Sequence, residues 1–258
     1  MTVQFNAVLD QHILRLSFGT AGRRNVMSDA WFAALEDHLR QAQGNPVVRV
    51  VLLSGQGDAF CAGADLKGLA TELFPEGYAR SALARLLERL ADFDKPLVAA
   101  VHGAAIGGGS TLLLHCDFVF AAEGTLFQLP FARLGLVPEF GASYLLPLHA
   151  GVRLARELVL LAAPFDAHTA KRAGIVSEVV MPQALMAHAQ TTAVALAALP
   201  PGSLRAAKRL LQAGHRAALA AAFAAEGKAL DAAVASPELH EAVDAFLSKR
   251  TPDFSRFS

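Results

Sequence analysis

The sequence has few cysteines and no excess charge of either sign. Cys61 and Cys116 are the only cysteines among the 258 residues, and their separation fits neither a metal-ligand motif nor the disulfide framework of a small secreted protein. We expect both thiols to be reduced. Because 23 acidic side chains balance 23 basic ones, the overall charge gives no attraction to nucleic acid, to an anionic membrane or to a polyanionic partner.

Long apolar runs and targeting signals are also missing. No segment reaches the ~20 uninterrupted apolar residues that a membrane span needs. Residues 1–6 have neither the basic nor the apolar character of a secretion signal, and residues 255–258 do not contain the peroxisomal tripeptide. We therefore expect a soluble, cytoplasmic protein without nucleic-acid or membrane partners. With 53% hydrophobic residues, the chain can bury a sizeable core.

Short hydrophobic runs alternate with a helical pattern in the N-terminal half. Between 81 and 94 the leucines and Phe93 fall on one stripe of a helix, while charged residues lie elsewhere. The runs have the length and composition of strands that are buried on both faces, and they cover 13–18, 47–53, 97–101 and 118–120. Strands that alternate with helices predict an α/β fold.

The C-terminal part is predicted to be helical after a last strand. Capping and breaking residues delimit a short helix, the strand and three further helical stretches, at 166–174, 175–180, 182–199, 203–235 and 236–249. The segment 200–202 is expected to break the chain between two of them, and Gly214 interrupts the third stretch. The Ala-rich part around 217–225 has more apolar surface than a lone helical pair hides. A partner subunit covers it, or it folds back on its own core; the pattern favours the partner.

Two segments of small residues each follow a hydrophobic run. They are 60–65, with the sequence FCAGAD, and 104–110, with the sequence AAIGGGS. Glycine has no Cβ, so such segments let the main chain approach a ligand and leave amide donors unpaired where a helix begins. Two turns of this kind can form an oxyanion hole. The alternative is that both are ordinary turns, the second leading into a helix over 110–115.

These segments resemble the crotonase, or enoyl-CoA hydratase/isomerase, superfamily. The resemblance also includes KPLVAAVHG at 95–103, Cys116-Asp117 and AGIV at 173–176, and it spans essentially the whole chain. It implies a ββα spiral core over 1–195 that binds acyl-CoA and carries catalysis, and a helical trimerisation segment over 196–258. The implied partners are an acyl-CoA substrate and further copies of the chain, as a trimer or hexamer. No metal or redox cofactor is implied.

The same resemblance assigns the two turns to a thioester carbonyl oxygen. The amides of Ala64 and Gly108 would hold that oxygen. Removing a proton beside the carbonyl places negative charge there, and each fixed donor stabilises it by ~3 kcal/mol.

The proton chemistry differs between branches of the family. Hydratases of the family hold a water with two glutamates, whereas this sequence has Thr111 and Phe131 at the matching positions. Neither is a general base, and Phe131 disfavours an ordered water. Glu139, after Pro138, matches the base of the peroxisomal-type Δ3,Δ2-enoyl-CoA isomerases. Nearby apolar residues, Phe140 among them, should raise its pKa. The alternative is an acid in a helix first turn, placed there by the helix dipole alone.

Further residues match positions that contact coenzyme A in the family. They are Ala62, Asp65, Leu66 and Lys67 in one loop, the basic Arg24, and Phe246 and Lys249 in the last helix, which would reach a neighbouring subunit's ligand. Thr111, Phe131 and Phe140 are assigned to the substrate pocket. His102 and His115 are interpreted as structural, and Asp117 as a buried, hydrogen-bonded acid.

The expected activity is therefore that of a Δ3,Δ2-enoyl-CoA isomerase with Glu139 as its base. Two alternatives remain. One is another reaction at the same enolate site, such as hydration or isomerisation of a ring-derived CoA ester. The other is an acyl-CoA-binding subunit without catalysis.

Overall fold

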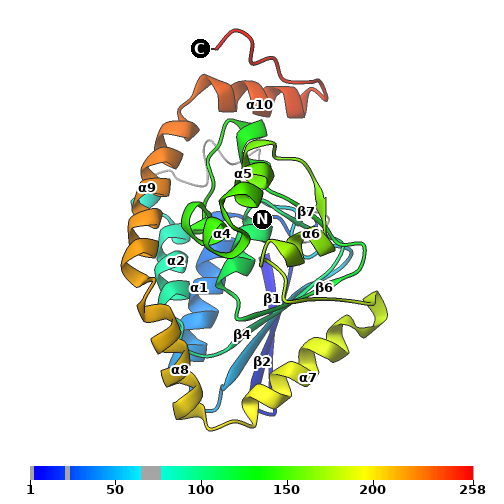
Figure 1. Ribbon diagram of the computed structural model, residues 1–258, viewed down its shortest axis with the longest axis vertical. Helices are drawn as coiled ribbons and strands as arrows, with labels where there is room; N and C mark the ends of the chain where they lie inside the picture. Colours follow the sequence, from blue (N-terminus) through cyan, green and yellow to red (C-terminus); the bar gives the residue numbers. More distant parts are fainter. Residues whose placement is uncertain (1–2, 21–23, 65–76, 258) are drawn as a thin grey trace.

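The computed structural model describes residues 3–20, 24–64 and 77–257, and its centre is a six-stranded sheet (Figure 1). The strand order is β1-β2-β3-β4-β6-β9. Only the β1/β2 pair is antiparallel. The strands span Val3–Asp10 (β1), Ile13–Thr20 (β2), Val50–Gly55 (β3), Leu97–Val101 (β4), Phe118–Ala122 (β6) and Glu178–Val180 (β9).

A second, three-stranded sheet follows β4 after a link of two residues. Its order is β5-β7-β8, and the strands span Ala104–Ile106, Leu126–Gln128 and Phe165–Asp166. The chain changes sheet at His102 and Gly103. Gly103 has φ +66°, and a Cβ there would lie 1.9 Å from the Asp58 carbonyl oxygen. Only glycine fits this crossing, which places β5 beside the segment that follows β3.

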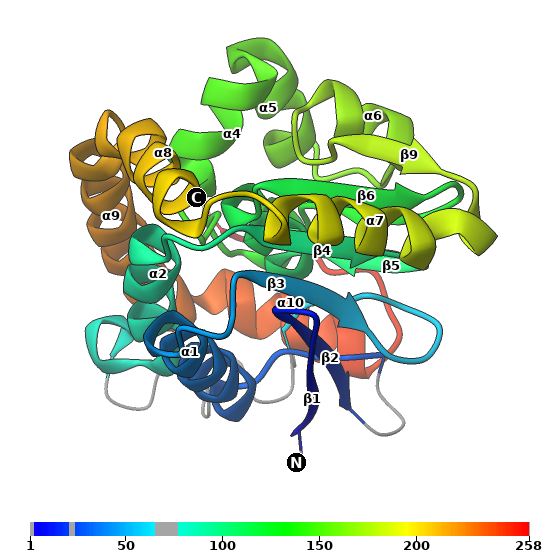
Figure 2. The ribbon, with the colours of Figure 1, turned by 90° about the horizontal axis from the view of Figure 1, so that it is seen from below.

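Helices cover both faces of the large sheet. α1 (Asp29–Gly44) and α2 (Ala82–Asp92) pack together, each capped by a serine side chain, and α7 (Leu185–Ala197) lies along β4 and β6 (Figure 2). The remaining helices are α3 (Gly108–Thr111), α4 (Ala142–Ala150), α5 (Val152–Leu160), α6 (Ala167–Arg172), α8 (Pro201–Ala213), α9 (Arg216–Val234) and α10 (Pro237–Leu247). Short 3₁₀ turns are η1 (Tyr78–Arg80), η2 (Leu112–His115), η3 (Phe131–Leu134) and η4 (Pro182–Ala184).

The central strands are buried on both faces, as their composition predicts. In β3, Val51 and Leu53 join the larger core cluster, whereas Val50 and Leu52 join the smaller one beneath α7. Side chains alternate between faces of a strand, so a run without polar residues marks a sheet covered on both sides. The predicted α/β fold is confirmed.

Some predicted boundaries differ from the structure. β3 begins at Val50 rather than at 47, because Asn45 Oδ1 accepts a hydrogen bond from the Val47 amide at 2.9 Å and forms a turn. The last strand begins at Glu178 rather than at 175. Pro200 caps α8 and Pro201 is its first residue, because proline lacks the N–H that a first turn leaves unpaired.

The C-terminal helices return to the body of the same chain. α9 runs beside α2 and α4 and contacts η1 (Figure 1). Leu219, Glu226, Gly227 and Leu230 are buried on that face, whereas Ala217 and Ala221 are exposed. Folding back therefore accounts for one face of the Ala-rich helix. The division of the chain at 195/196 and the oligomerising role of the second part stay predictions. No helix in the described ranges is both long and apolar enough to cross a membrane.

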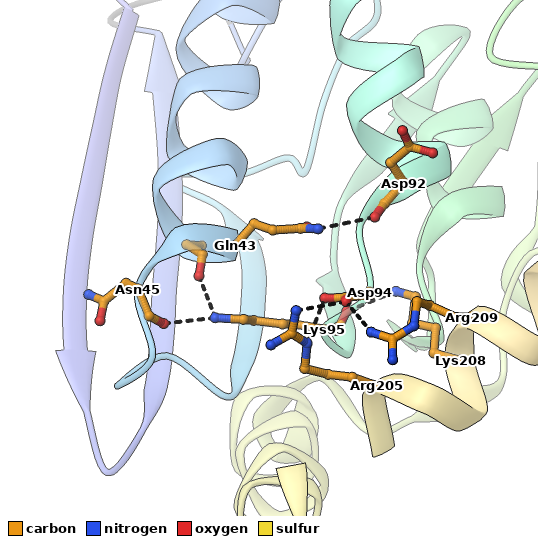
Figure 3. A network of polar contacts seen from close by, with 9 residues as sticks. Gln43, Asn45, Asp92, Asp94, Lys95, Arg205, Lys208 and Arg209 are labelled. Atoms are coloured by element: carbon orange, nitrogen blue, oxygen red, sulfur yellow. Dashed lines mark hydrogen bonds and ion pairs between the residues drawn. The ribbon is translucent and has the colours of Figure 1, made fainter. Parts of the chain in front are cut away.

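A polar network anchors α8 to the start of β4 (Figure 3). Asp94 accepts two hydrogen bonds from Arg205, at 2.9 and 2.8 Å, and one from Arg209 at 2.7 Å. Lys208 Nζ donates to the Lys95 carbonyl at 2.8 Å, while Lys95 Nζ donates to two carbonyls near the end of α1. Since α9 follows α8 directly, this network also fixes where α9 begins.

Asp117 belongs to the same network but is less buried than the sequence predicts. Its Oδ2 accepts from Lys208 Nζ at 2.6 Å and from the Leu97 amide at 2.7 Å. Its side chain nevertheless keeps 29% of its surface exposed. The hydrogen-bonded part of the interpretation is confirmed, and the buried part is wrong for the single chain.

Candidate active site

The two small-residue segments lie side by side. The Cys61 amide donates to the Ala104 carbonyl at 2.9 Å, and the Ile106 amide donates back to the Cys61 carbonyl at 2.9 Å. Gly63 has φ +89°, and a Cβ there would lie 3.0 Å from the Ile106 carbonyl oxygen. Small residues are therefore needed where the segments meet, as the sequence predicts.

Two backbone amides at this meeting point have no hydrogen-bond acceptor in the described part of the chain. They are those of Ala64 and Gly108. Gly107, with φ +53°, turns the chain from β5 into α3, so Gly108 is the first helical residue and its N–H has no acceptor within the helix. Two such donors are what a thioester oxyanion needs. The assignment of these amides to an oxyanion hole stays a prediction.

Glu139 lies against Gly108. A Cβ on Gly108 would lie 2.9 Å from Glu139 Oε1 and 2.9 Å from Met27 Sδ. Although Glu139 keeps part of its surface accessible, the surrounding protein desolvates its carboxyl, and the negative charge of Glu226 adds to the effect. Together they raise the pKa of Glu139 to about 8. The expected rise in pKa is confirmed, and such a group can both accept and return a proton near neutral pH.

A left-handed turn, rather than a helix, holds Glu139. Phe140 has φ +60° and Gly141 has φ +68°, and α4 begins only at Ala142. Glu139 thus precedes the helix instead of occupying its first turn. The helix dipole does not explain the position of this acid.

His115 supports the same turn from the side of η2. Its Nε2 donates to the Phe140 carbonyl at 2.7 Å, and burial lowers the pKa of His115 to about 4. The ring is neutral at physiological pH, and the proton sits on Nε2 because a carbonyl oxygen can only accept. The structural role predicted for His115 is confirmed.

The raised pKa predicts a stability that depends on pH. A carboxyl whose pKa is higher in the folded state favours folding below its unfolded pKa, and the contribution is lost as pH rises through the folded value of about 8. The variant Glu139→Gln removes this titration. The free energy of unfolding of Glu139→Gln minus that of wild type should therefore increase by about 2–4 kcal/mol from pH ~5 to pH ~8.5. Urea unfolding of both proteins at the two pH values checks this, and an equal difference at both would contradict it.

Glu226 is a second carboxylate at the site, and the sequence did not predict it there. It is 4% exposed, and its two oxygens accept the amides of Gly141 and Ser143 at 2.7 and 2.8 Å. The sequence associates its helix with oligomerisation alone. The available signal was its spacing: Glu226 follows Leu219 by seven residues and Phe223 by three, so this acid lies on the apolar stripe of the helix.

The residues assigned to the substrate pocket are buried. Thr111 is 1% exposed, and its hydroxyl donates to the Gly107 carbonyl at 3.3 Å. Phe131, in η3, is 5% exposed. Phe140 has no exposed surface, and its ring lies 6.2 Å from that of Phe32. Of these three, Phe140 lies against Gly108, because a Cβ there would be 3.5 Å from Phe140 Cε2. Contact with a substrate stays a prediction.

The residues assigned to coenzyme A fall into three groups. Arg24 and Ala62 lie together, because the Ala62 amide donates to the Arg24 carbonyl at 3.0 Å; the Arg24 side chain is 70% exposed. Asp65, Leu66 and Lys67 lie outside the described residues. Phe246 and Lys249 are both exposed, at the end of α10 and just after it. The structure leaves their exposed side chains accessible to a ligand or a neighbouring subunit, and the role itself stays a prediction.

The remaining candidates have structural partners. His102 Nε2 lies 2.9 Å from the Gly57 carbonyl oxygen, which agrees with a structural role. Both cysteines are free thiols, and burial raises the pKa of Cys61 to about 12, so this thiol is not a nucleophile at neutral pH. No group of three potential metal-ligating side chains occurs in the residues that the structure describes.

Comparisons with known proteins agree with this arrangement. The family described as "Enoyl-CoA hydratase/isomerase" matches residues 10–256. In Escherichia coli (strain K12), 2,3-dehydroadipyl-CoA hydratase is 35% identical over 95% of each chain, and 1,2-epoxyphenylacetyl-CoA isomerase is 34% identical over 96% of each. The crystal structure of an enoyl-CoA hydratase/isomerase from Pseudoalteromonas atlantica T6c has a TM-score of 0.91 at 36% identity, covering 97% of this chain and 99% of that one. With its fold and these similarities, the chain belongs to the enoyl-CoA hydratase/isomerase, or crotonase, family.

Proposed function

We propose that this family member is an enoyl-CoA isomerase of the Δ3,Δ2 type, with Glu139 as its only proton-transferring side chain. One observation carries the proposal: the Glu139 carboxyl, with a pKa of about 8, lies against Gly108 beside two amides that have no acceptor among the described residues. A base next to an oxyanion site is the arrangement that enolate chemistry at a thioester requires.

The reaction follows from this geometry. Ionised Glu139 removes a proton from C2 of a 3-enoyl thioester, and the electrons of that C–H bond spread over a dienolate. The charge on the thioester oxygen is stabilised by the amides of Ala64 and Gly108. Protonated Glu139 then returns the same proton to C4, and the double bond moves from C3–C4 to C2–C3. No water is consumed, so one group serves as both base and acid.

Hydration fits the described side chains less well. A hydratase needs a second group to hold and activate water, and Thr111 and Phe131 cannot provide it. Glu226 is close, but each of its oxygens accepts a backbone amide. Among the described residues, no hydrogen bond contributes to the pKa of Glu139, which burial and the charge of Glu226 raise.

A second candidate is isomerisation of a ring-derived CoA ester at the same site. It is supported by the similarity to a relative named 1,2-epoxyphenylacetyl-CoA isomerase, at 34% identity. That reaction is also an isomerisation and adds no water. It therefore differs from the first candidate in substrate and not in the need for an oxyanion hole.

Product analysis tests the proposal. Purified protein is incubated separately with trans-3-enoyl-CoA and trans-2-enoyl-CoA thioesters of several chain lengths and with a ring-derived CoA ester. The products are followed by mass spectrometry and by the absorbance of the conjugated thioester. A conjugated product of unchanged mass supports the proposal. A product heavier by one water supports hydration, and turnover of ring-derived esters alone supports the second candidate. Binding of acyl-CoA without turnover of any enoyl thioester would identify a non-catalytic binding subunit.

The pH dependence of the reaction follows from the pKa of Glu139. Because the base must be ionised, kcat/KM should rise with pH and reach half its maximum near the pKa of about 8. Below that value it should fall about tenfold for each pH unit. Initial rates with a 3-enoyl thioester between pH ~6 and ~9.5 measure this. A midpoint near the ordinary glutamate pKa of ~4.3 would contradict the proposed environment of the base.

We also propose that the protein forms a homo-oligomer, either a trimer or a hexamer. Leu210 and Leu211 of α8 are each 77% exposed and Phe246 of α10 is 58% exposed, and exposed apolar groups of this size favour an interface. Light scattering coupled to size-exclusion chromatography should give three or six times the mass of the chain. A monomer at working concentrations would contradict this part of the proposal.

A further inference from the structure

We infer that Glu226, on α9, is a positioning residue for Glu139: it holds the turn at 140–143 through two backbone amides and so keeps the Glu139 carboxyl against Gly108. The inference rests on the proposed role of Glu139 as base. It assigns a task in the active site to a helix that the sequence associates only with oligomerisation.

The hydrogen bonds of Glu226 replace a missing helix cap. α4 begins after Gly141, which has no side chain to cap it. The Ala142 amide donates to the Glu139 carbonyl at 3.1 Å, but the amides of Gly141 and Ser143 have no local side-chain acceptor. Glu226 Oε2 accepts the Gly141 amide at 2.7 Å, and Oε1 accepts the Ser143 amide at 2.8 Å. The cap comes from more than 80 residues further along the chain. Any movement of α9 therefore moves the turn that carries Glu139.

Packing places Glu226 where it can do this. A Cβ on Gly141 would lie 2.5 Å from Leu219 Cδ1 and 2.9 Å from Phe223 Cε1, so α9 rests directly on the turn. His115 contacts the same turn through the Phe140 carbonyl, and its ring lies 6.0 Å from that of Phe223 on α9. A bulky residue such as Phe140 at positive φ costs about 1–3 kcal/mol and persists only where its surroundings impose it. Here the contacts of α9 and His115 with the turn impose it.

The charges around Glu226 give it a second, separable effect. Glu139 faces it from the turn, and Tyr78 faces both acids from η1; burial raises the pKa of Tyr78, and Glu139, Glu226, Asp231 of α9 and Glu88 of α2 raise it further. Burial also raises the pKa of Glu226, while the amides of the turn and the Ser143 side chain oppose that rise. No basic side chain in the described ranges acts on the pKa of either Glu139 or Glu226. The negative charge of Glu226 therefore disfavours the ionised form of Glu139.

Two substitutions separate the hydrogen bonds from the charge. Glu226→Gln removes the charge and places an amide NH₂ opposite a backbone donor. Glu226→Asp keeps the charge but withdraws the carboxylate by one methylene. Asp231→Asn is the matched control: Asp231 also lies on α9 and accepts one backbone amide, from Tyr78 at 2.8 Å, but it does not act on the pKa of Glu139.

The expected results differ for each variant. In Glu226→Gln, the midpoint of the kcat/KM profile should move about one pH unit lower, and the maximal kcat should fall about 10- to 100-fold. In Glu226→Asp, kcat should fall to a similar extent while the midpoint stays near that of wild type. Asp231→Asn should leave the midpoint in place. A change in stability alone would move neither quantity.

A readout that needs no turnover keeps this test independent of the proposed function. The carboxyl of Glu139 is titrated by ¹³C NMR in protein labelled at the glutamate δ-carbon and is assigned with Glu139→Gln. A lower Glu139 pKa in Glu226→Gln, unchanged in Asp231→Asn, supports the inference even if wild type is inactive with 3-enoyl thioesters, which would refute only the proposed function. Glu226→Gln and Glu226→Asp variants that both keep the wild-type kcat and Glu139 pKa would overturn it. If Glu226→Gln does not fold, an unchanged kcat in Glu226→Asp overturns it.

Discussion

Replacing Glu139 with Gln should lower kcat for isomerisation about a thousandfold while KM for the acyl-CoA changes little. The amide has nearly the shape of the carboxyl, so the contacts near Gly108 are kept, but an amide cannot remove the C2 proton. The residual rate then comes from the amides of Ala64 and Gly108 and from binding alone. Stopped-flow or steady-state assays with a 3-enoyl thioester, together with binding of a saturated acyl-CoA, measure both quantities.

A matched substitution controls for the loss of a partly buried glutamate. The Glu36 side chain, on α1, is 20% exposed and pairs with Arg89 on α2. Glu36→Gln should keep kcat close to that of wild type. Full turnover by Glu139→Gln would assign proton transfer to another group. Because Glu139→Gln should also be more stable than wild type at alkaline pH, a low rate in a well-folded variant cannot be attributed to unfolding.

The alternation of elements was predictable because burial on both faces leaves a simple pattern. β3 and β4 contain almost only apolar residues, and each alternates its side chains between two core clusters. What local pattern could not predict is that the turn after β3 lies beside β5. That contact depends on Gly103, where the chain crosses from one sheet to the other. A Cβ at this position would lie 1.9 Å from the Asp58 carbonyl oxygen. The family resemblance supplied this pairing, and the residues alone did not.

The backbone conformation around Glu139 could not be predicted from the sequence. A proline followed by an acid is typical of a helix start, and α4 does start nearby. Its beginning is delayed to Ala142 by two left-handed residues, one of them the bulky Phe140. Gly141 adopts this conformation readily, but no local preference favours it at Phe140. It is imposed by contacts with His115 and α9, which lie 25 and more than 80 residues away in the sequence.

Glu226 was missed for a related reason. Its helix is rich in alanine, so both the face that packs on the chain and the exposed face contain small apolar residues. The composition therefore does not show which face of the helix packs against the rest of the chain. A single acid on the Leu219, Phe223 and Leu230 stripe was the informative residue, because a buried carboxylate requires hydrogen-bond donors. Only the fold shows that these donors are the amides of Gly141 and Ser143.

Gly108→Ala should lower kcat about a hundredfold with little change in stability. The new Cβ would lie 2.9 Å from both Glu139 Oε1 and Met27 Sδ, which belong to unbranched side chains that can turn away by a few tenths of an ångström. Moving Glu139 by even about 1 Å nevertheless separates the base from the oxyanion site. Gly44→Ala, at the end of α1 with no atom within 4 Å of its Cβ, is the matched control and should keep full activity. Steady-state rates and thermal unfolding of both variants measure the two effects. A fully active Gly108→Ala would mean that C2 of the thioester does not lie between Gly108 and Glu139 when its proton is removed.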